Sequence, residues 1–280
     1  MMRLQGGPAM ADTASKRARF RKLHESGCFV IPNPWDVGSA RLLEQLGFRA
    51  LATTSSGLAW SLGRADNHVS LDEVLSHLRA LAGAVSIPVS ADFEHGFADQ
   101  PEAVAANVAR AASTGIAGLS IEDSTGKADA PLFDPTLAVE RIRAARHAVD
   151  GAASHLVLTA RSEGFLVGRP DLRETIARLT AYAEAGADCV YAPGIRSKED
   201  IRAVVSALAP TPVNVLVGSN FATVAELAAL GVRRISVGGA LARVAWGGFL
   251  EAAKELAERG TFGGLAHAVP FAEIDGAFAR

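Results

Sequence analysis

The segment that reveals the architecture of this chain reads Ile87-Pro88-Val89-Ser90-Ala91-Asp92-Phe93-Glu94-His95-Gly96. Its first five residues form a short apolar run that is typical of a buried parallel strand, so two carboxylates stand where the strand ends. Side chains two positions apart on a strand share a face, and we therefore expect Asp92 and Glu94 to point the same way. Two carboxylates held close together repel each other unless a cation or a proton lies between them. The segment thus predicts a divalent-metal site.

The pattern of an apolar strand followed by a helical segment repeats along the chain. Four helical segments end at a glycine that is placed to be a left-handed helix cap, and an apolar strand follows each one. These glycines are Gly47, Gly115, Gly186 and Gly231. The predicted strands are 28–32, 50–54, 87–91, 117–121, 155–160, 189–192, 213–216 and 234–237. Eight such units favour a closed (β/α)8 TIM-type barrel over an open doubly wound sheet, since no Gly-x-Gly-x-x-Gly fingerprint follows the first strand.

Length and composition narrow the remaining possibilities. With 280 residues and 49% hydrophobic content, the chain is expected to form one α/β domain. A formal net charge of -2, with both signs interspersed, argues against nucleic acid and membrane as partners. Cys28 and Cys189 are far apart and predict neither a disulfide framework nor a zinc site, which suits a cytoplasmic protein. We divide the chain into a disordered leader (1–16), a catalytic barrel (17–260) and a C-terminal helical extension (261–280).

In such barrels the chemistry takes place at the carboxyl ends of the strands, so residues at those positions are candidates for the site. They include small hydroxyls, carboxylates, an arginine and an asparagine: Thr54, Ser55, Ser56, Asp92, Glu94, Glu122, Arg161 and Asn214. Carboxylate oxygens of this kind suit a hard cation, Mg²⁺ or Mn²⁺, that also binds substrate. Arg161 offers a planar fork for a substrate carboxylate. Asp123 is expected to pair with a lysine or arginine instead.

Six motifs lie at or near the predicted strand ends. They are Asn33-Pro34-Trp35-Asp36, Thr53-Thr54-Ser55-Ser56-Gly57, Leu62-Gly63-Arg64-Ala65-Asp66, Ala91-Asp92-Phe93-Glu94-His95-Gly96-Phe97, Ile121-Glu122-Asp123 and Ala160-Arg161-Ser162-Glu163-Gly164-Phe165. In order and spacing the chain resembles the isocitrate lyase/phosphoenolpyruvate mutase superfamily over nearly its whole length. The resemblance implies a Mg²⁺-dependent enzyme that makes or breaks a C–C or P–C bond next to a small 2-oxo or 2-hydroxy carboxylate, through a metal-stabilised enolate.

The resemblance also implies a role for each matching residue. Asp92 would be the direct metal ligand, and the other carboxylates would hold the cation through its waters; Glu94 replaces the commoner second aspartate. The predicted metal residues are Asp92, Glu94, Asp66 and Glu122. The predicted substrate-binding residues are Thr54, Ser55, Ser56, Gly57, Trp35, Arg161 and Asn214. The predicted catalytic residues are Arg161, Glu122 and Lys127.

The chain departs from the superfamily in the loop after the fourth strand. Isocitrate and methylisocitrate lyases resemble one another in a Lys-Lys/Arg-Cys-Gly-His loop whose cysteine is the catalytic acid, whereas this chain has Ser124-Thr125-Gly126-Lys127-Ala128-Asp129-Ala130. The mutase and phosphonopyruvate hydrolase branches carry a loop lysine and an asparagine, and the asparagine is missing here. The leading hypothesis is therefore C–C cleavage of an oxaloacetate-like or substituted malate-like acid. The proton donor stays open among Lys127, Tyr191, His95 and water.

Other functions compete with this hypothesis. Within the superfamily, the alternatives are a P–C bond enzyme and a weak methylisocitrate lyase. Val217-Gly218-Ser219 and Val237-Gly238-Gly239 follow the last two strands, where many barrels bind a phosphate, so a phosphosugar isomerase or aldolase is a further possibility. That hypothesis leaves the carboxylate cluster unexplained. A barrel that binds a small dicarboxylate without catalysis is an alternative from a different class.

The C-terminal part of the chain predicts assembly with other copies. An alanine-rich helical pattern covers 240–259, and apolar residues beyond it need a surface to cover them: Phe262, Phe271, Ile274 and Phe278. Members of the superfamily resemble one another in exchanging a C-terminal helix between subunits. We therefore expect a homo-oligomer, a dimer of dimers.

Overall fold

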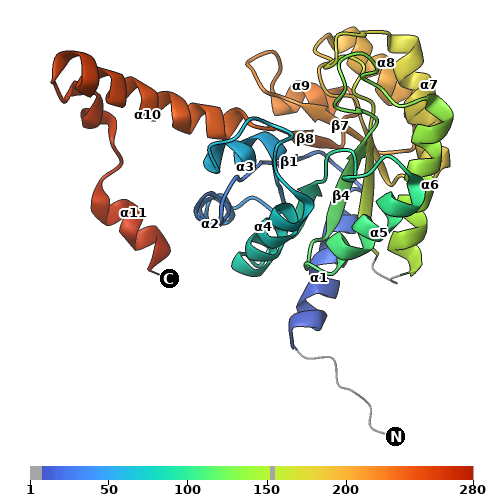
Figure 1. Ribbon diagram of the computed structural model, residues 1–280, viewed down its shortest axis with the longest axis horizontal. Coiled ribbons are helices and arrows are strands. Elements are labelled where there is room, and N and C mark those ends of the chain that lie inside the picture. The colour runs from blue at the N-terminus through green and yellow to red at the C-terminus, as the bar shows by residue number, and fades with distance from the viewer. Residues whose placement is uncertain (1–7, 152–154, 280) are drawn as a thin grey trace, which may run out of the picture.

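The computed structural model describes residues 8–151 and 155–279, and they form the predicted barrel (Figure 1). Eight parallel strands pair in the order β1-β8-β7-β6-β5-β4-β3-β2. The strands are β1 (Phe29–Ile31), β2 (Leu51–Ala52), β3 (Val89–Asp92), β4 (Gly118–Glu122), β5 (Val157–Arg161), β6 (Cys189–Tyr191), β7 (Val213–Leu216) and β8 (Arg234–Ser236). Each of the eight lies at a predicted strand position, so the prediction of a (β/α)8 fold is confirmed.

Helices lie around the strands and continue beyond them. They are α1 (Pro8–Leu23), α2 (Val37–Gln45), α3 (Ser55–Ser61), α4 (Leu71–Ala84), α5 (Pro101–Ala112), α6 (Pro135–Gly151), α7 (Leu172–Glu184), α8 (Lys198–Leu208), α9 (Val224–Ala229), α10 (Ala240–Arg259), the 3-10 helix η1 (Gly263–His267) and α11 (Phe271–Phe278). Among the helices in the described ranges, none combines the length and apolarity needed to cross a bilayer.

The predicted glycine caps adopt the expected backbone conformation. Gly47, Gly115, Gly186 and Gly231 have φ values of 86°, 93°, 106° and 88°. A side chain at these angles would be strained, so glycine is the residue that turns the chain from each helix into the next strand. The helices then pack apolar faces on the strands, and the buried core includes Leu78, Val104, Leu119, Ile142 and Leu179. The repeated cap thus sets where four of the eight strands begin, namely β2, β4, β6 and β8.

The barrel closes between β1 and β2, and β2 is its shortest strand. The backbone N–H of Ala52 in β2 donates to the carbonyl of Pro32, one residue beyond β1, at 3.0 Å. Asn33 strengthens this seam, because its Nδ2 donates to the carbonyl of Thr53 at 2.9 Å. Its Oδ1 accepts from the N–H groups of Val237 and Gly238, each at 2.9 Å. One side chain therefore ties the ends of three strands together.

The N-terminal helix differs from the disordered leader expected over 1–16. Residues 1–7 lie outside the described part, but α1 begins at Pro8 and covers the amino-terminal end of the barrel. Lys16 is buried and donates to the carbonyls of Ala82 and Val85 at 3.0 and 2.8 Å. Phe20 is fully buried in a cluster with the first residues of several strands. These contacts order a segment whose own composition is polar.

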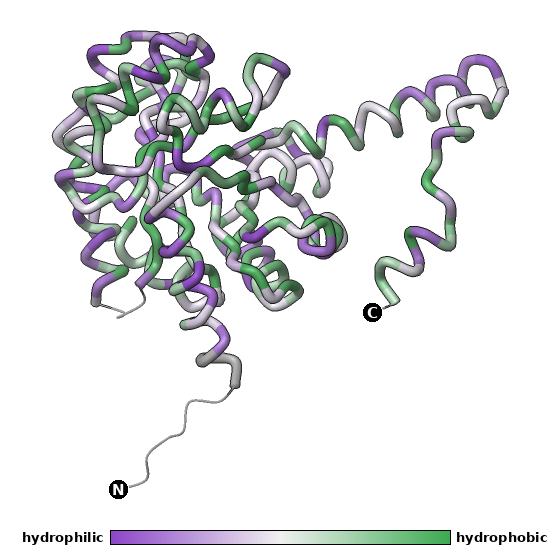
Figure 2. The backbone as a smooth tube through the Cα atoms, turned by 180° about the vertical axis from the view of Figure 1, so that it is seen from behind, coloured by the Kyte–Doolittle hydropathy of each residue, from purple (hydrophilic) through white to green (hydrophobic). Residues whose placement is uncertain are grey.

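The C-terminal segment forms an arm, comprising α10, η1 and α11, that extends away from the barrel (Figures 1 and 2). The boundary expected at residue 260 therefore falls inside this arm, because α10 already leaves the barrel. The arm returns to touch α2, where Gln45 Nε2 donates to the carbonyl of Ala277 at 2.6 Å. Many of its apolar side chains are exposed in this single chain: Val244, Phe249, Leu250, Phe262, Leu265, Val269, Phe271 and Ile274.

Candidate active site

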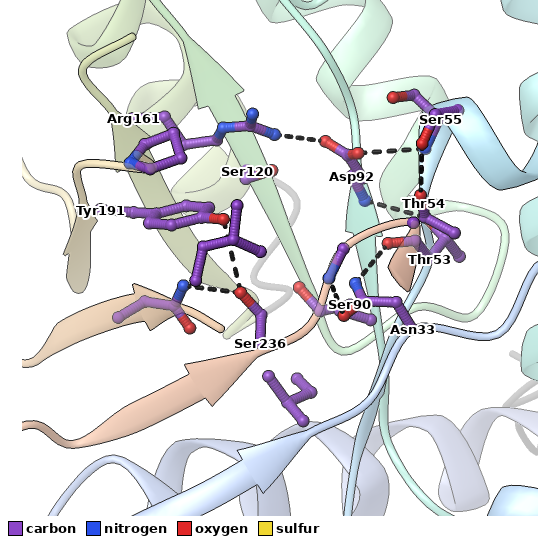
Figure 3. Close-up of a pocket in the computed structure, with 18 of the residues that line it drawn as sticks. Asn33, Thr53, Thr54, Ser55, Ser90, Asp92, Ser120, Arg161, Tyr191 and Ser236 are labelled. Atoms are coloured by element: carbon purple, nitrogen blue, oxygen red, sulfur yellow. Dashed lines mark hydrogen bonds and ion pairs between the residues drawn. The ribbon is translucent and has the colours of Figure 1, made fainter. Parts of the chain in front are cut away.

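A cavity of about 180 Å³ lies inside the barrel at the carboxyl ends of the strands (Figure 3). Seven predicted site residues line it: Thr54, Ser55, Ser56, Asp66, Asp92, Arg161 and Asn214. Predicted residues outside this lining are Trp35, Gly57, Glu94, Glu122 and Lys127. The strand ends, together with the loop that carries Asp66, thus bring together the hydroxyl turn (Thr54, Ser55 and Ser56), two carboxylates and the arginine.

Arg161, the last residue of β5, is the centre of the charge network. Its Nη1 lies 2.6 Å from Asp92 Oδ1, and its Nη2 lies 3.2 Å from Glu122 Oε2. Its Nε lies 2.8 Å from Glu163 Oε1. The guanidinium carbon is also 5.2 Å from the centre of the Tyr191 ring. Because three carboxylates approach it from different sides, the planar fork has one fixed orientation, directed at Asp92 (Figure 3).

Asp92 is fixed from its other side by the hydroxyl turn. Its backbone N–H donates to Thr53 Oγ1 at 2.9 Å. Its Oδ2 accepts from the N–H of Ser55 at 3.0 Å, so this carboxylate faces the positive first turn of α3. Thr54 begins that helix as its N-cap, accepting from the N–H of Gly57. A Cβ at Gly57 would lie 2.6 Å from Thr54 Cγ2, so the turn requires glycine.

Glu94 is close to Asp92, but not through the strand alternation that we expected. The strand ends at Asp92, and Glu94 adopts a left-handed backbone with φ 47°. Burial, with added repulsion from Asp92 and Asp66, raises the pKa of the Glu94 carboxyl to about 8. The two acidic side chains therefore do share an electrostatic environment, and a turn rather than a pleat brings them together.

The other acidic residues show the same excess of negative charge. Burial raises the pKa of Asp66, and a hydrogen bond from Ser55 offsets this only in part. Burial also raises the pKa of Glu122 well above its ordinary range, against the favourable attraction of Arg161. One arginine thus faces several carboxylates that lack full compensation, a donor set that fits a hard cation. In the described ranges, no three His, Cys, Asp or Glu side chains form a ready-made ligand cage.

Glu163 is a site residue that the sequence reasoning did not assign. It is buried, accepts from Arg161, and its backbone N–H donates to Asp123 Oδ1 at 2.8 Å. Asp123 in turn lies 3.3 Å from Arg178 and accepts from the Tyr182 hydroxyl at 2.7 Å. The expected pairing of Asp123 with a basic residue is therefore present. A carboxylate two positions after Arg161 was the available signal for Glu163.

Several predicted residues lie away from the cavity or are already engaged. Trp35 packs behind the hydroxyl turn, since its Cβ is 2.9 Å from the position that a Gly57 Cβ would take. Lys127 is exposed and lies 3.1 Å from Asp99. Asn214 lines the cavity, but its Nδ2 donates to Ser236 Oγ at 2.9 Å and its Oδ1 accepts from Arg234 Nε at 2.8 Å. Asn214 therefore holds two other residues of the cavity lining in place.

The side chains considered as proton donors occupy different places. Tyr191 lines the cavity, and Ser236 donates to its hydroxyl oxygen at 3.4 Å. Burial raises the pKa of Tyr191 to about 12, so its hydroxyl keeps the proton at neutral pH. His95 is outside the lining, and its backbone carbonyl accepts from Arg141. Of these candidates, Tyr191 has the position of a group that can meet a ligand.

Comparison with known proteins gives one family match that spans most of the chain. The profile of the phosphoenolpyruvate phosphomutase family matches residues 20–257. Among curated proteins, the oxaloacetate decarboxylase of Paraburkholderia xenovorans is 30% identical over 219 residues, which are 74% of this chain and 71% of that protein. All six motifs named above fall within the matched range.

Solved structures also resemble this chain over most of its length. A protein of Burkholderia cenocepacia J2315, provisionally described as a lyase/mutase, is 50% identical, with a TM-score of 0.93 over 96% of this chain and 98% of its own. Oxaloacetate acetylhydrolase in complex with its product oxalate is 29% identical, with a TM-score of 0.84 over 94% of both chains. Phosphonopyruvate hydrolase in complex with oxalate and Mg²⁺ is 28% identical, with a TM-score of 0.82 over 93% of this chain and 95% of its own.

Proposed function

Because this chain belongs to the phosphoenolpyruvate mutase family of the isocitrate lyase/phosphoenolpyruvate mutase superfamily, we propose that it is a Mg²⁺-dependent carbon–carbon lyase. Its substrate would be a small 2-oxo or 2-hydroxy carboxylic acid of the oxaloacetate or substituted malate type. The observation that carries this proposal is the Arg161 fork, held at 2.6 Å from Asp92 beside a cavity of small-molecule size. Relatives that act on oxaloacetate support the choice of substrate class.

The acidic residues are proposed to hold the cation. Asp92 lines the cavity and would be the direct ligand, while Asp66, Glu94 and Glu122 would act through waters. When bound, Mg²⁺ supplies positive charge beside the oxygen that becomes negative as the bond breaks. The Mg²⁺ in the complex of phosphonopyruvate hydrolase supports this assignment. Mn²⁺ has the same ligand preference and could replace it.

The chain's own groups would orient the substrate and manage its proton. Ser55 and Ser56 supply hydroxyls, and α3 supplies N–H groups, for the substrate carboxylate. Arg161 would donate to the substrate oxygens on the side opposite the metal. Negative charge grows there as the bond breaks, and the guanidinium would stabilise it. Tyr191, which lines the cavity and stays protonated at neutral pH, is the proposed proton donor to the carbon left after cleavage.

Turnover assays test this function directly. Purified protein is incubated with oxaloacetate, 2,3-dimethylmalate, methylisocitrate or phosphonopyruvate, with Mg²⁺ or with EDTA. We expect C–C cleavage of oxaloacetate or the substituted malate that EDTA removes, and a kcat about 10²-fold lower for Tyr191→Phe with little change in KM. Turnover of phosphonopyruvate alone would instead indicate P–C chemistry. Binding without any product would indicate a non-catalytic barrel.

The pH dependence of stability tests the acidic cluster. Glu94 has a pKa of about 8 in the folded chain and an ordinary value of 4.5, so the folded chain binds more protons between these values. Stability of the metal-free protein should therefore fall as pH rises from about 5 to 8. We expect Tm to fall over this interval, Mg²⁺ to raise Tm more at pH 8 than at pH 5, and Glu94→Gln to flatten the slope. Equal slopes for wild type and variant would remove Glu94 from the cluster.

The arm is proposed to hold subunits together in a dimer of dimers. Its exposed apolar side chains include Phe249, Phe262 and Phe271, and an apolar surface of this kind is typical of a contact with another chain. We expect light scattering to give a tetramer mass, and Phe249→Glu combined with Phe271→Glu to reduce it. The matched control Glu251→Gln, on the exposed side of α10, should leave the mass unchanged. A monomeric wild type would refute the proposal.

A further inference from the structure

A chain of hydrogen bonds runs through the barrel interior from the end of α1 to the cavity. It begins at His24, whose Nδ1 lies 2.9 Å from the carbonyl oxygen of Phe20. A carbonyl only accepts, so Nδ1 carries the imidazole proton and Nε2 is left as an acceptor. Arg234 Nη1 lies 3.3 Å from Nε2. Burial and the charge of Arg234 lower the pKa of His24 to about 3, so the ring is neutral at neutral pH and accepts from the guanidinium.

Arg234 fixes the orientation of the Asn214 amide. A guanidinium in a protein is always protonated and has donors only, so its Nε must face the amide oxygen, which lies 2.8 Å away. Both side chains are buried, with Asn214 1% and Arg234 5% exposed. Turning the amide over would lose a hydrogen bond to a charged donor, which favours the observed orientation by roughly 10- to 100-fold. The amide nitrogen is therefore directed at Ser236.

The direction of the bonds is passed on to the cavity. Because Asn214 Nδ2 is a donor, Ser236 Oγ accepts from it, at 2.9 Å. The Ser236 hydroxyl then donates its own proton to the Tyr191 oxygen, 3.4 Å away (Figure 3). Since the Tyr191 oxygen accepts this bond, the phenolic proton is turned away from Ser236. Tyr191 lines the cavity, so this proton is left for a ligand there.

We propose that Asn214, oriented by Arg234, is a positioning residue that acts through Ser236 to present the Tyr191 proton to the bound substrate. The inference rests on the proposed function, in which Tyr191 protonates the carbon left after cleavage. As the phenolic O–H bond breaks, its electron pair stays on the Tyr191 oxygen, and the bond accepted from Ser236 stabilises the phenolate. The phenolate regains its proton from water after product release. Asn214 thereby affects the reaction without touching the substrate.

Asn214→Asp tests the direction of the chain, because it replaces the donating amide nitrogen with an oxygen that only accepts. Ser236 must then donate to the new carboxylate and accept from Tyr191, which turns the phenolic proton away from the substrate. The new carboxylate also faces Arg234, so we expect the variant to fold. With Mg²⁺ and oxaloacetate or 2,3-dimethylmalate, whichever the wild type cleaves, kcat should fall about 10²-fold with little change in KM, as for Tyr191→Phe.

A double-mutant cycle separates this effect from that of the added charge. In the Tyr191→Phe background, Asn214→Asp should lower kcat by less than about threefold, because no phenolic proton is left to turn. Losses that multiply would show that the charge acts independently of Tyr191 and would overturn the inference, as would a wild-type kcat for Asn214→Asp. Ser236→Ala breaks the chain without reversing it, so its loss should be smaller, about tenfold. A loss larger than that of Asn214→Asp contradicts the proposed direction.

Neutron diffraction from a deuterium-exchanged wild-type crystal tests the inference without turnover, because deuterium positions show the amide orientation and both hydroxyl directions. A Ser236 deuterium directed at Tyr191, with the Asn214 amide nitrogen directed at Ser236, supports the inference even if no acid is cleaved and the lyase is refuted. A Tyr191 deuterium directed at Ser236 overturns it even if the lyase is confirmed. The same experiment decides the question if Asn214→Asp does not fold.

Discussion

Asp92→Ala is expected to lower metal-dependent turnover by about 10³-fold or more, because it removes both the proposed direct ligand and one of the three carboxylate partners of Arg161. The carboxylate lies 2.6 Å from Arg161 and 3.0 Å from the Ser55 N–H, so it links two groups that are proposed to bind substrate. Its loss would disturb cation and substrate binding together. Steady-state kinetics across a Mg²⁺ titration measures the effect, and excess Mg²⁺ should not restore the rate.

The control for this variant is Asp72→Ala on the exposed surface of α4. Asp72 pairs with Arg110 and is 83% exposed, so its removal should change neither kcat nor the Mg²⁺ dependence. Circular dichroism then establishes that both variants are folded. Wild-type turnover by Asp92→Ala would remove Asp92 from the site and would leave the lyase proposal without its metal ligand.

Arg161→Lys is expected to lower kcat/KM by about 10²-fold or more while the protein stays folded. An ammonium retains the charge but cannot present a planar fork to Asp92, Glu122 and Glu163 at once. The free energy of unfolding should also fall, by about 1–3 kcal/mol, because a buried carboxylate loses its hydrogen bond. Denaturant titration and steady-state kinetics give the two quantities separately.

An arginine in a different ion-pair network provides the matched control. Arg146 is half-buried and pairs with Asp150 and Asp188, and none of the three lines the cavity. Arg146→Lys should therefore reduce stability without a comparable loss of turnover. If Arg161→Lys and Arg146→Lys lose activity only in proportion to stability, then Arg161 has a structural role and does not orient the substrate.

The fold could be predicted from local signals. Left-handed glycines such as Gly47 and Gly186 ended helices where the sequence indicated, because a positive φ is a property of the backbone at one position. Strand ends then followed, and with them the placement of Asp92 and Arg161. Residues with a role determined by strand order and local turns were therefore accessible before the structure.

The positions of the other site residues could not be predicted, because most of them depend on contacts between distant parts of the chain. Arg234 follows the Gly231 cap by three residues, and only the closed barrel places it in the cavity lining beside Asn214. Asn33 belongs to one of the six motifs, but only the closed barrel brings its side chain to the ends of β2 and β8, with which it forms hydrogen bonds. Glu94 was expected to alternate with Asp92 along a strand, but its positive φ replaces the pleat with a turn. Sequence periodicity predicts neither such long-range contacts nor a positive φ at a residue other than glycine.

The N-terminal helix has a consequence for the order in which the chain acquires its structure. Lys16 bonds to carbonyls at Ala82 and Val85, and Arg21 pairs with Asp188. During synthesis α1 leaves the ribosome long before these partners exist, so it cannot settle until most of the barrel has been made. Helix α1 is thus among the last helices to dock, although its residues are made before the barrel strands, and until then the apolar side chain of Phe20 stays exposed.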